Sequence, residues 1–247
     1  MSAFGDAVVY LNDPFNWTKP RGILELTGQH LRISGLAVGL GLVLALPLAI
    51  WLGHTGRGGT LTVAISNVSR AVPTLAVLTI FAVTPLAFTI WAPVIALTLF
   101  AIPPILANTY VGMREVDRDV VEAARGMGLS NGQVIRRVEL PLALPLVMTG
   151  IRTAAVQVVA TATLAALLGG GTLGSVVRTG FATQKYGVVV AGALLVAALA
   201  LLTEVVLSLL SWALSPRTGQ RHLPWSRRQI PAPGAPSAER ELAGAPL

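Results

Sequence analysis

The chain alternates between long apolar segments and shorter polar ones. Five apolar segments occupy residues 33–52, 61–83, 85–110, 142–168 and 188–214. A helix rises 1.5 Å per residue, so about 20 residues are needed to cross a hydrocarbon layer of about 30 Å. Backbone groups in lipid must satisfy one another, which makes apolar segments of this length helical. The pattern therefore predicts an all-α integral membrane protein with five transmembrane helices.

The segments outside these spans divide the chain into three regions. Residues 1–30 are polar and contain Pro14 and Pro20, and we expect an external N-terminal segment that ends in a short helix over 23–30. Residues 1–16 lack the basic and apolar stretches of a signal peptide, so no cleavage is expected. Residues 31–214 form the transmembrane domain. Residues 215–247 hold six prolines and scattered arginines, which is typical of a disordered tail, here on the cytoplasmic side.

The longest polar interruption between spans covers residues 113–141 and begins with an amphipathic pattern. Polar and charged side chains alternate there with apolar residues at helical spacing, namely Val116, Val120, Ala123, Ala124 and Met127. This spacing predicts a helix over 113–127. Gly126 and Gly128 should end that helix, because glycine tolerates the dihedral angles of a turn.

A second helical signal follows the glycines. Ser130 and Gln133 are three residues apart, which is the spacing of a capping box at a helix start. Pro141 should end this second helix, because the residue before a proline is pushed out of the α region. The sequence thus predicts a helix, a tight glycine turn and a helix that project from the membrane as a docking element.

Composition supports a membrane protein and excludes several kinds of site. The chain is 53% hydrophobic and 12% charged, whereas soluble domains carry about 25% charged residues. It has no cysteine, which rules out disulfides and thiolate metal sites. His30, His54 and His222 lack the spacing of a metal site. The net charge of +7 reflects arginines in loops and tail, as membrane topology requires, and not nucleic-acid binding.

The basic residues predict an orientation. With residues 113–141 in the cytoplasm, eleven arginines lie inside and five basic residues lie outside, although the flanks of the first span favour the reverse. The whole-chain imbalance predicts an external N-terminus and a cytoplasmic C-terminus. The inside set is Arg57, Arg114, Arg118, Arg125, Arg136, Arg137, Arg217, Arg221, Arg227, Arg228 and Arg240, and the outside set is Lys19, Arg21, Arg32, Arg178 and Lys185.

Three charged residues fall inside predicted spans: Arg70, Arg152 and Glu204. A charge at the bilayer centre costs about 2.5–3.5 kcal/mol on insertion scales, so such residues face the bundle, form pairs or snorkel. One interpretation is a buried structural ion pair of Glu204 with Arg70 or Arg152. The alternative is that these residues line a solute path.

A glycine cluster at 169–174 precedes the last span, but it is not a phosphate-binding loop. A Walker A loop needs a lysine directly after its last glycine, and neither of the two lysines, Lys19 and Lys185, follows a glycine. We expect a turn or re-entrant element at the outer face. No nucleotide cofactor is therefore expected on this chain.

The polar loop resembles a known family motif. Glu122-Ala123-Ala124, Gly128, Val138 and Leu140-Pro141 have the spacing of the EAA loop of ABC-importer permeases, with Val138 in place of isoleucine. The resemblance implies that Glu122, Ala123, Ala124, Gly128 and Leu129 couple the chain to an ATPase subunit. It also implies a type I importer permease fold in a bacterial inner membrane.

Further matches favour the osmoprotectant branch, which imports glycine betaine, choline or carnitine. They are Gln29-His30-Leu31, Pro73-Thr74-Leu75-Ala76, the run from Ile105 to Tyr110, the run from Gly150 to Ala154, and the run from Ala162 to Ala166. The glycine cluster is similar to a family segment, with Thr172 as a departure. The branch implies a second permease subunit as copy or paralogue, two ATPase subunits that bind ATP and magnesium, and an external solute-binding protein.

Two alternatives remain open from the sequence. The EAA loop is shared widely, so the cargo could be methionine, a sulfonate or another small solute. A secondary transporter or channel is a different class, which inverted repeats around broken helices would favour. The sequence shows no convincing internal repeat.

Overall fold

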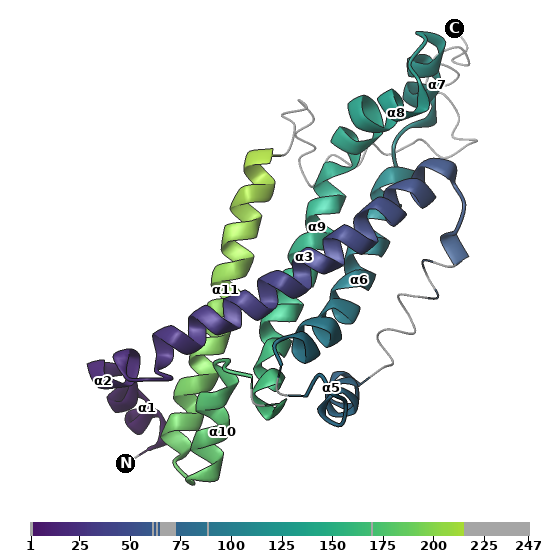
Figure 1. Cartoon of the computed structure of the whole chain (residues 1–247). Coiled ribbons are helices and arrows are strands. Elements are labelled where there is room, and N and C mark those ends of the chain that lie inside the picture. Colours follow the sequence, from purple (N-terminus) through teal and green to yellow (C-terminus); the bar gives the residue numbers. More distant parts are fainter. Residues whose placement is uncertain are drawn as a thin grey trace, which may run out of the picture. The chain divides into compact units, whose positions relative to one another are not determined.

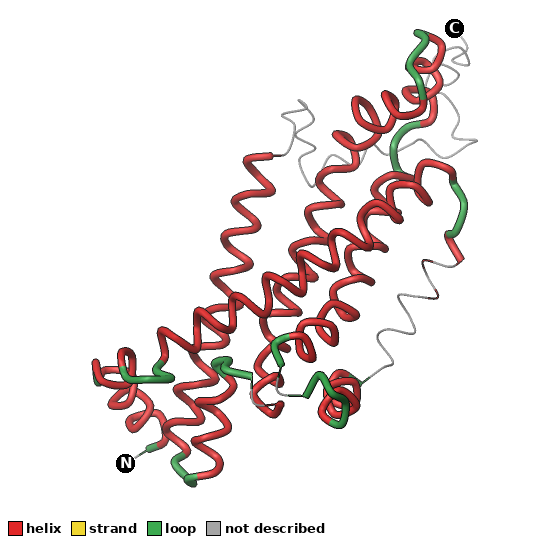
Figure 2. Tube along the Cα trace, viewed as in Figure 1, coloured by secondary structure: helices red, strands yellow, loops and turns green. Residues whose placement is uncertain are grey.

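The computed structural model describes residues 2–60, 62, 64, 73–87, 89–168 and 170–214. Every regular element of this part of the chain is a helix, as Figure 2 shows. The elements labelled in Figure 1, with the short segments between them, are α1 (Ala3–Asn12), α2 (Pro14–Thr18), α3 (Ile23–Thr55), α5 (Thr74–Ala82), α6 (Trp91–Arg114), α7 (Arg118–Gly126), α8 (Asn131–Val134), η1 (Ile135–Glu139), α9 (Leu140–Thr161), η2 (Ala162–Leu168), α10 (Gly174–Ala182) and α11 (Tyr186–Leu214).

Four helical stretches within the described residues are long and apolar enough to cross a membrane. They are Pro14–Thr55, Trp91–Arg114, Asn131–Leu167 and Tyr186–Leu214. The predicted span at 61–83 lies largely outside the described residues, and its described end is the nine-residue α5. The all-α membrane fold is therefore confirmed, and the count of five spans stays a prediction.

Two predicted boundaries differ from the structure. The first spanning helix begins at Ile23, so residues 23–30 are the start of α3 and not a separate short helix. The third span begins at Trp91 rather than at residue 85, because hydrogen-bonded turns precede it, such as that from Thr89 N–H to the Leu86 carbonyl.

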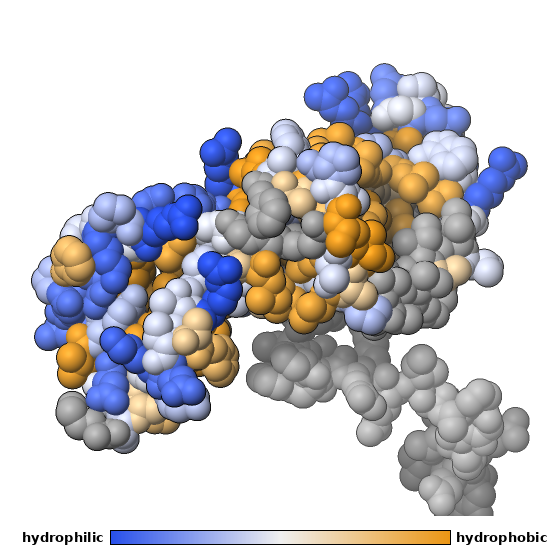
Figure 3. Space-filling model, turned by 60° about the horizontal axis from the view of Figure 1, so that its bottom comes forward, coloured by the Kyte–Doolittle hydropathy of each residue, from blue (hydrophilic) through white to orange (hydrophobic). Residues whose placement is uncertain are grey.

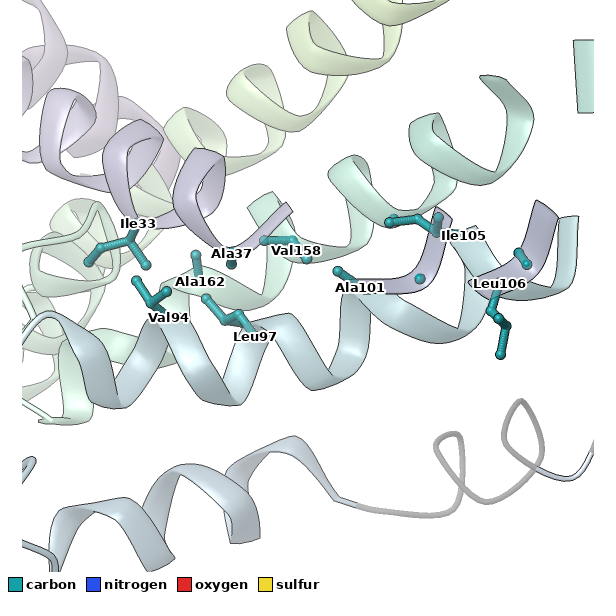
Figure 4. Packing of buried hydrophobic residues seen from close by; sticks show 12 residues of the cluster. Ile33, Ala37, Val94, Leu97, Ala101, Ile105, Leu106, Val158 and Ala162 are labelled. Carbon is teal, nitrogen blue, oxygen red and sulfur yellow. The ribbon is translucent and has the colours of Figure 1, made fainter. Parts of the chain in front are cut away.

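Helices α3, α6 and α9 pack against one another, with α6 in extensive contact with both of the others. The main hydrophobic core fills the space between these helices, and Figure 4 shows the side chains that form it. Ile33 and Ala37 come from α3, while Leu97 and Ile105 come from α6 and Val158 from α9. Because the core joins residues far apart in sequence, it fixes these three helices into one bundle.

Close approach and buried polar contacts set the register of the bundle. A β-carbon at Gly150 of α9 would lie 2.8 Å from the Pro104 carbonyl oxygen of α6, so a side chain there would push the two helices apart. On α3, His30 is fully buried and its Nε2 donates to the carbonyl of Val159, 2.8 Å away on α9. This bond satisfies a polar group that would be costly to bury alone.

The shorter helices gather at the two ends of the bundle. Helices α1 and α10 pack on the first part of α11, and the glycine cluster from 170 to 174 joins η2 to α10 at the same end. Helices α7 and α8 lie at the opposite end (Figure 1). In Figure 3 hydrophilic residues gather over α1, α2 and α10, whereas hydrophobic residues cover much of the surface next to them.

Two predictions for residues 113–141 were wrong in detail. Glu115 to Asp117 break the helix expected over 113–127, and α7 begins at Arg118 with the Asp117 side chain as its N-cap. Pro141 does not end the second helix, because helical structure continues from Asn131 to Leu167. The five-residue π segment η1 precedes the proline. At its C-cap, the Leu140 N–H bonds to the Ile135 carbonyl. Proline lacks a backbone N–H, but the first turn of a helix has no intrahelical acceptor for one. Pro141 can therefore occupy the first turn of α9 without the loss of a hydrogen bond.

Candidate functional site

The turn between α7 and α8 depends on Gly128. Its φ is +86°, in the left-handed region that glycine adopts readily. The Gly128 N–H bonds to the Arg125 carbonyl at 2.9 Å, and Leu129 N–H bonds to Ala124 at 3.2 Å, which closes the end of α7. Ser130 and Gln133 then form a full capping box that opens α8. The predicted helix–glycine–helix element is therefore present.

Helix α7 has two apolar faces rather than one. Its inner face carries Val121 and Ala124, which are buried in a cluster with Met113, Val134 and Val147. This cluster attaches α7 to the end of the bundle.

The outer face of α7 carries Val120 and Ala123, and Met127 at the C-cap extends this face and is 75% exposed. Glu122 and Gly128 are exposed as well, and Leu129 is half-buried against the inner cluster. Ala124 faces inward and is only 2% exposed, although the spacing in the sequence grouped it with Ala123 as one apolar face. A partner can reach Glu122, Ala123 and Gly128, while Ala124 and Leu129 support them from behind.

A buried carboxylate connects the element to the spanning helices. Glu139 of η1 is fully buried, and its Oε2 lies 2.6 Å from Nδ1 of His54 near the end of α3. Its Oε1 lies 3.7 Å from Nη1 of Arg118, the first residue of α7. The carboxylate thus sits at the junction of α3, η1 and α7.

Sequence reasoning missed the exposed positions of Val120 and Met127 and the buried position of Glu139. The sequence shows the helical spacing of Val120, Ala123 and Met127. It does not show that these residues face away from Val116 and Ala124. Glu139 gave no local signal, because its partner His54 lies 85 residues earlier in the chain.

Of the three charged residues predicted inside the spans, the structure describes Arg152 and Glu204 but not Arg70. Arg152 of α9 pairs with Glu204 of α11, with 3.3 Å between Nε and Oε1, and its Nη1 donates to Ser208 at 3.4 Å. The two side chains are 32% and 42% exposed in the single chain, so the pair lies at the bundle surface and not in its centre. Arg70 lies outside the described residues.

Comparison with protein families gives one assignment that covers most of the chain. Residues 38–219 match the family described as the inner membrane component of binding-protein-dependent transport systems. The chain belongs to this family. It is therefore a multi-pass membrane permease component, which agrees with its apolar helices.

Curated relatives of this permease align over most of their own length. It is 38% identical to the carnitine transport permease protein OpuCB of Listeria monocytogenes, across 79% of this chain and 89% of the relative. It is 36% identical to the choline transport system permease protein OpuBB of Bacillus subtilis, across 81% and 91%.

Solved structures show the same fold. A chain of the MetNI methionine ABC transporter, in inward-facing conformations, matches this permease with a TM-score of 0.69 and 22% identity, across 83% of this chain and all of that one. A chain of an amino acid ABC transporter matches with a TM-score of 0.61 and 17% identity, across 87% and 98%. The bundle therefore has the type I fold of ABC-importer permeases.

Proposed function

We propose that this permease forms the membrane pathway of an ATP-driven importer for quaternary-ammonium osmoprotectants, the class of glycine betaine, choline and carnitine. The observation that carries the proposal is the exposed helix–glycine–helix element on a fold shared with ABC-importer permeases, in a chain whose relatives are named for carnitine and choline transport. The relatives support the cargo class, and the element supports the coupling role.

The coupling role follows from the two faces of α7. In this proposal Glu122, Ala123 and Gly128 meet a cleft of a soluble ATPase subunit, with Val120 and Met127 beside them. Exposed apolar residues at i, i+3 and i+7 are the pattern of a helix that docks in a groove. Ala124 and Leu129 hold the helix against the bundle, and Glu139 transmits its motion to α3.

The partners follow from that arrangement. Two ATPase subunits bind and hydrolyse ATP with magnesium, a second permease subunit completes the pathway, and an external solute-binding protein delivers the cargo. The ATPase activity belongs to the partner, so this chain is a transport subunit and not an enzyme. The element lies in the cytoplasm, and α1, α2 and α10 lie outside.

Uptake measurements test the cargo and the class of transporter. For this test, the chain is expressed together with an ATPase subunit and a solute-binding protein of the same importer class, in cells that lack their own osmoprotectant importers. Labelled glycine betaine, choline or carnitine should accumulate, and unlabelled methionine should not compete. Competition by methionine would reassign the cargo. Uptake that persists in an ATPase-inactive variant, and stops when the ion gradients are collapsed, would indicate a secondary transporter.

A further inference from the structure

The end of the bundle that carries α7 also contains a strongly basic cavity. Its volume is about 730 Å³, within the range of small-molecule sites. Four arginines line it, namely Arg57, Arg114, Arg118 and Arg125, together with the residues Trp51, His54, Thr55, Asn131 and Ile135. Such a concentration of guanidinium groups favours an anionic ligand, because arginine binds phosphate oxygens through paired donors.

The arginines are poorly neutralised by the protein itself. Across the described part of the chain, the side chains of Arg57, Arg114 and Arg125 form no ion pair. Arg118 reaches one carboxylate, Glu139, at 3.7 Å, and that carboxylate already contacts His54 at 2.6 Å. Arg114 is positioned against the end of α3, where a β-carbon at Gly56 would lie 2.8 Å from its Nη1. The cavity therefore carries excess positive charge.

Trp51 is a guide to the depth of the cavity in the membrane. Trp51 lies one turn before the end of spanning helix α3, and its side chain is 56% exposed. Tryptophan at the end of a spanning helix favours the headgroup level, where its ring is partly apolar and partly hydrated. In the proposed orientation, this preference puts the cavity opening near the level of lipid phosphates.

We propose that this cavity binds the phosphate-bearing headgroup of an anionic phospholipid. Basic pockets beside spanning helices on the cytoplasmic side bind such headgroups. The proposal rests on the cytoplasmic orientation proposed above, and it goes beyond the transport function.

The geometry of α7 separates this cavity from the apolar part of the proposed ATPase surface, whereas Glu122, four residues after Arg118, lies on the arginine side. Arg118 and Arg125 are seven residues apart, about two helical turns, and therefore lie on one side of the helix. At about 100° per residue, Val120, Ala123 and Met127 lie roughly opposite. A headgroup could thus occupy one side of α7 while an ATPase occupies the other, and the lipid would fix α7 against α3.

The test compares two double variants of the full chain in detergent. Arg57→Gln with Arg125→Gln removes two cavity arginines that form no ion pair in the described structure. Arg136→Gln with Arg137→Gln is the matched control, because these exposed arginines lie nearby on η1 but do not line the cavity. Native mass spectrometry then counts bound phosphatidylglycerol and phosphatidylcholine, with and without excess inorganic phosphate.

We expect the chain to retain phosphatidylglycerol in preference to phosphatidylcholine. Each arginine near an anionic surface contributes roughly a fivefold factor, so the cavity variant should bind phosphatidylglycerol about 25-fold more weakly and the control should be unchanged. Equal retention of both lipids, or equal loss in both variants, would overturn the proposal. Displacement of the lipid by inorganic phosphate would reassign the site to a soluble phosphate.

Co-purification tests whether the cavity arginines bind the ATPase subunit and not a lipid. If the cavity variant keeps its preference for phosphatidylglycerol but loses the co-expressed ATPase, the arginines serve the ATPase and the lipid proposal is wrong. If lipid binding falls while the ATPase surface around Met127 still retains its partner, the lipid assignment holds. That second result would leave the proposed coupling role of α7 unaffected. The experiment can therefore contradict the lipid proposal without contradicting the coupling proposal.

Discussion

At the scale of single residues, Gly128 and Glu139 determine where α7 can lie. Gly128 supplies a backbone conformation that L side chains resist, and Glu139 supplies the one buried carboxylate among the described residues. Neither residue belongs to the hydrophobic core, yet each contacts or shapes the junction between α7 and the bundle. Changes at these positions should therefore affect the element while leaving the spans folded.

Replacing Gly128 by alanine should weaken the turn through the backbone alone. A β-carbon there would meet nothing within 4 Å, so the cost is the left-handed conformation, about 1 kcal/mol. Gly126→Ala is the control, since that glycine is helical and equally open, and alanine should stabilise it by about 0.5–1 kcal/mol. Hydrogen exchange of the Met127 and Leu129 amides measures both effects. Equal exchange in the two variants would contradict this account of the turn.

Replacing Glu139 by glutamine should lower the thermal stability of the purified chain. The neutral amide leaves His54 and Arg118 without their carboxylate, and a buried group left unsatisfied costs about 1–3 kcal/mol. Glu115→Gln, at an exposed carboxylate after α6, should leave the unfolding temperature unchanged. An unchanged unfolding temperature in Glu139→Gln would show that the carboxylate does not stabilise the junction.

At the scale of elements, the ion pair between Arg152 and Glu204 joins α9 to α11. Helix α11 buries few residues within the chain, so polar contacts contribute more to its attachment than they do for α6. The pair lies at the bundle surface, where hydrocarbon or a second subunit surrounds it. An unpaired charge is costly in such surroundings.

A double-mutant cycle measures this attachment. Glu204→Gln alone should lower the folded yield and the unfolding temperature, because Arg152 is left without its partner. Adding Arg152→Gln should restore part of the loss, with a coupling energy of about 1 kcal/mol or more. Additive effects of the two changes on the unfolding temperature would mean that the pair contributes nothing to the bundle.

The sequence predicted some elements of the site and not others, for identifiable reasons. The turn at Gly128 and the capping box at Ser130 were predictable because their chemistry is local. The inward position of Ala124 was not, because spacing alone cannot say which of two apolar faces packs on the bundle. The continuation through Pro141 depends on a π segment, and the role of Glu139 depends on His54, which is distant in the chain.

At the scale of the whole molecule, the two ends of the bundle should lie on opposite sides of the membrane. The chain has no cysteine, so single cysteines can report their side without background. Gly132→Cys in α8 should react with an impermeant maleimide only after cells are opened, whereas Thr183→Cys between α10 and α11 should react in intact cells. The reverse labelling pattern would overturn the proposed orientation.

In our proposal, the helix–glycine–helix element couples ATP hydrolysis to solute uptake. Uptake of labelled glycine betaine in cells without their own importers, measured together with ATPase co-purification, tests this role. Gly128→Val should leave membrane expression normal but lower uptake about tenfold or more, because a β-branched residue strains the turn that we propose meets the ATPase. Gly126→Val should transport nearly as the native chain does. Normal uptake and normal ATPase retention in a well-expressed Gly128→Val protein would contradict the account.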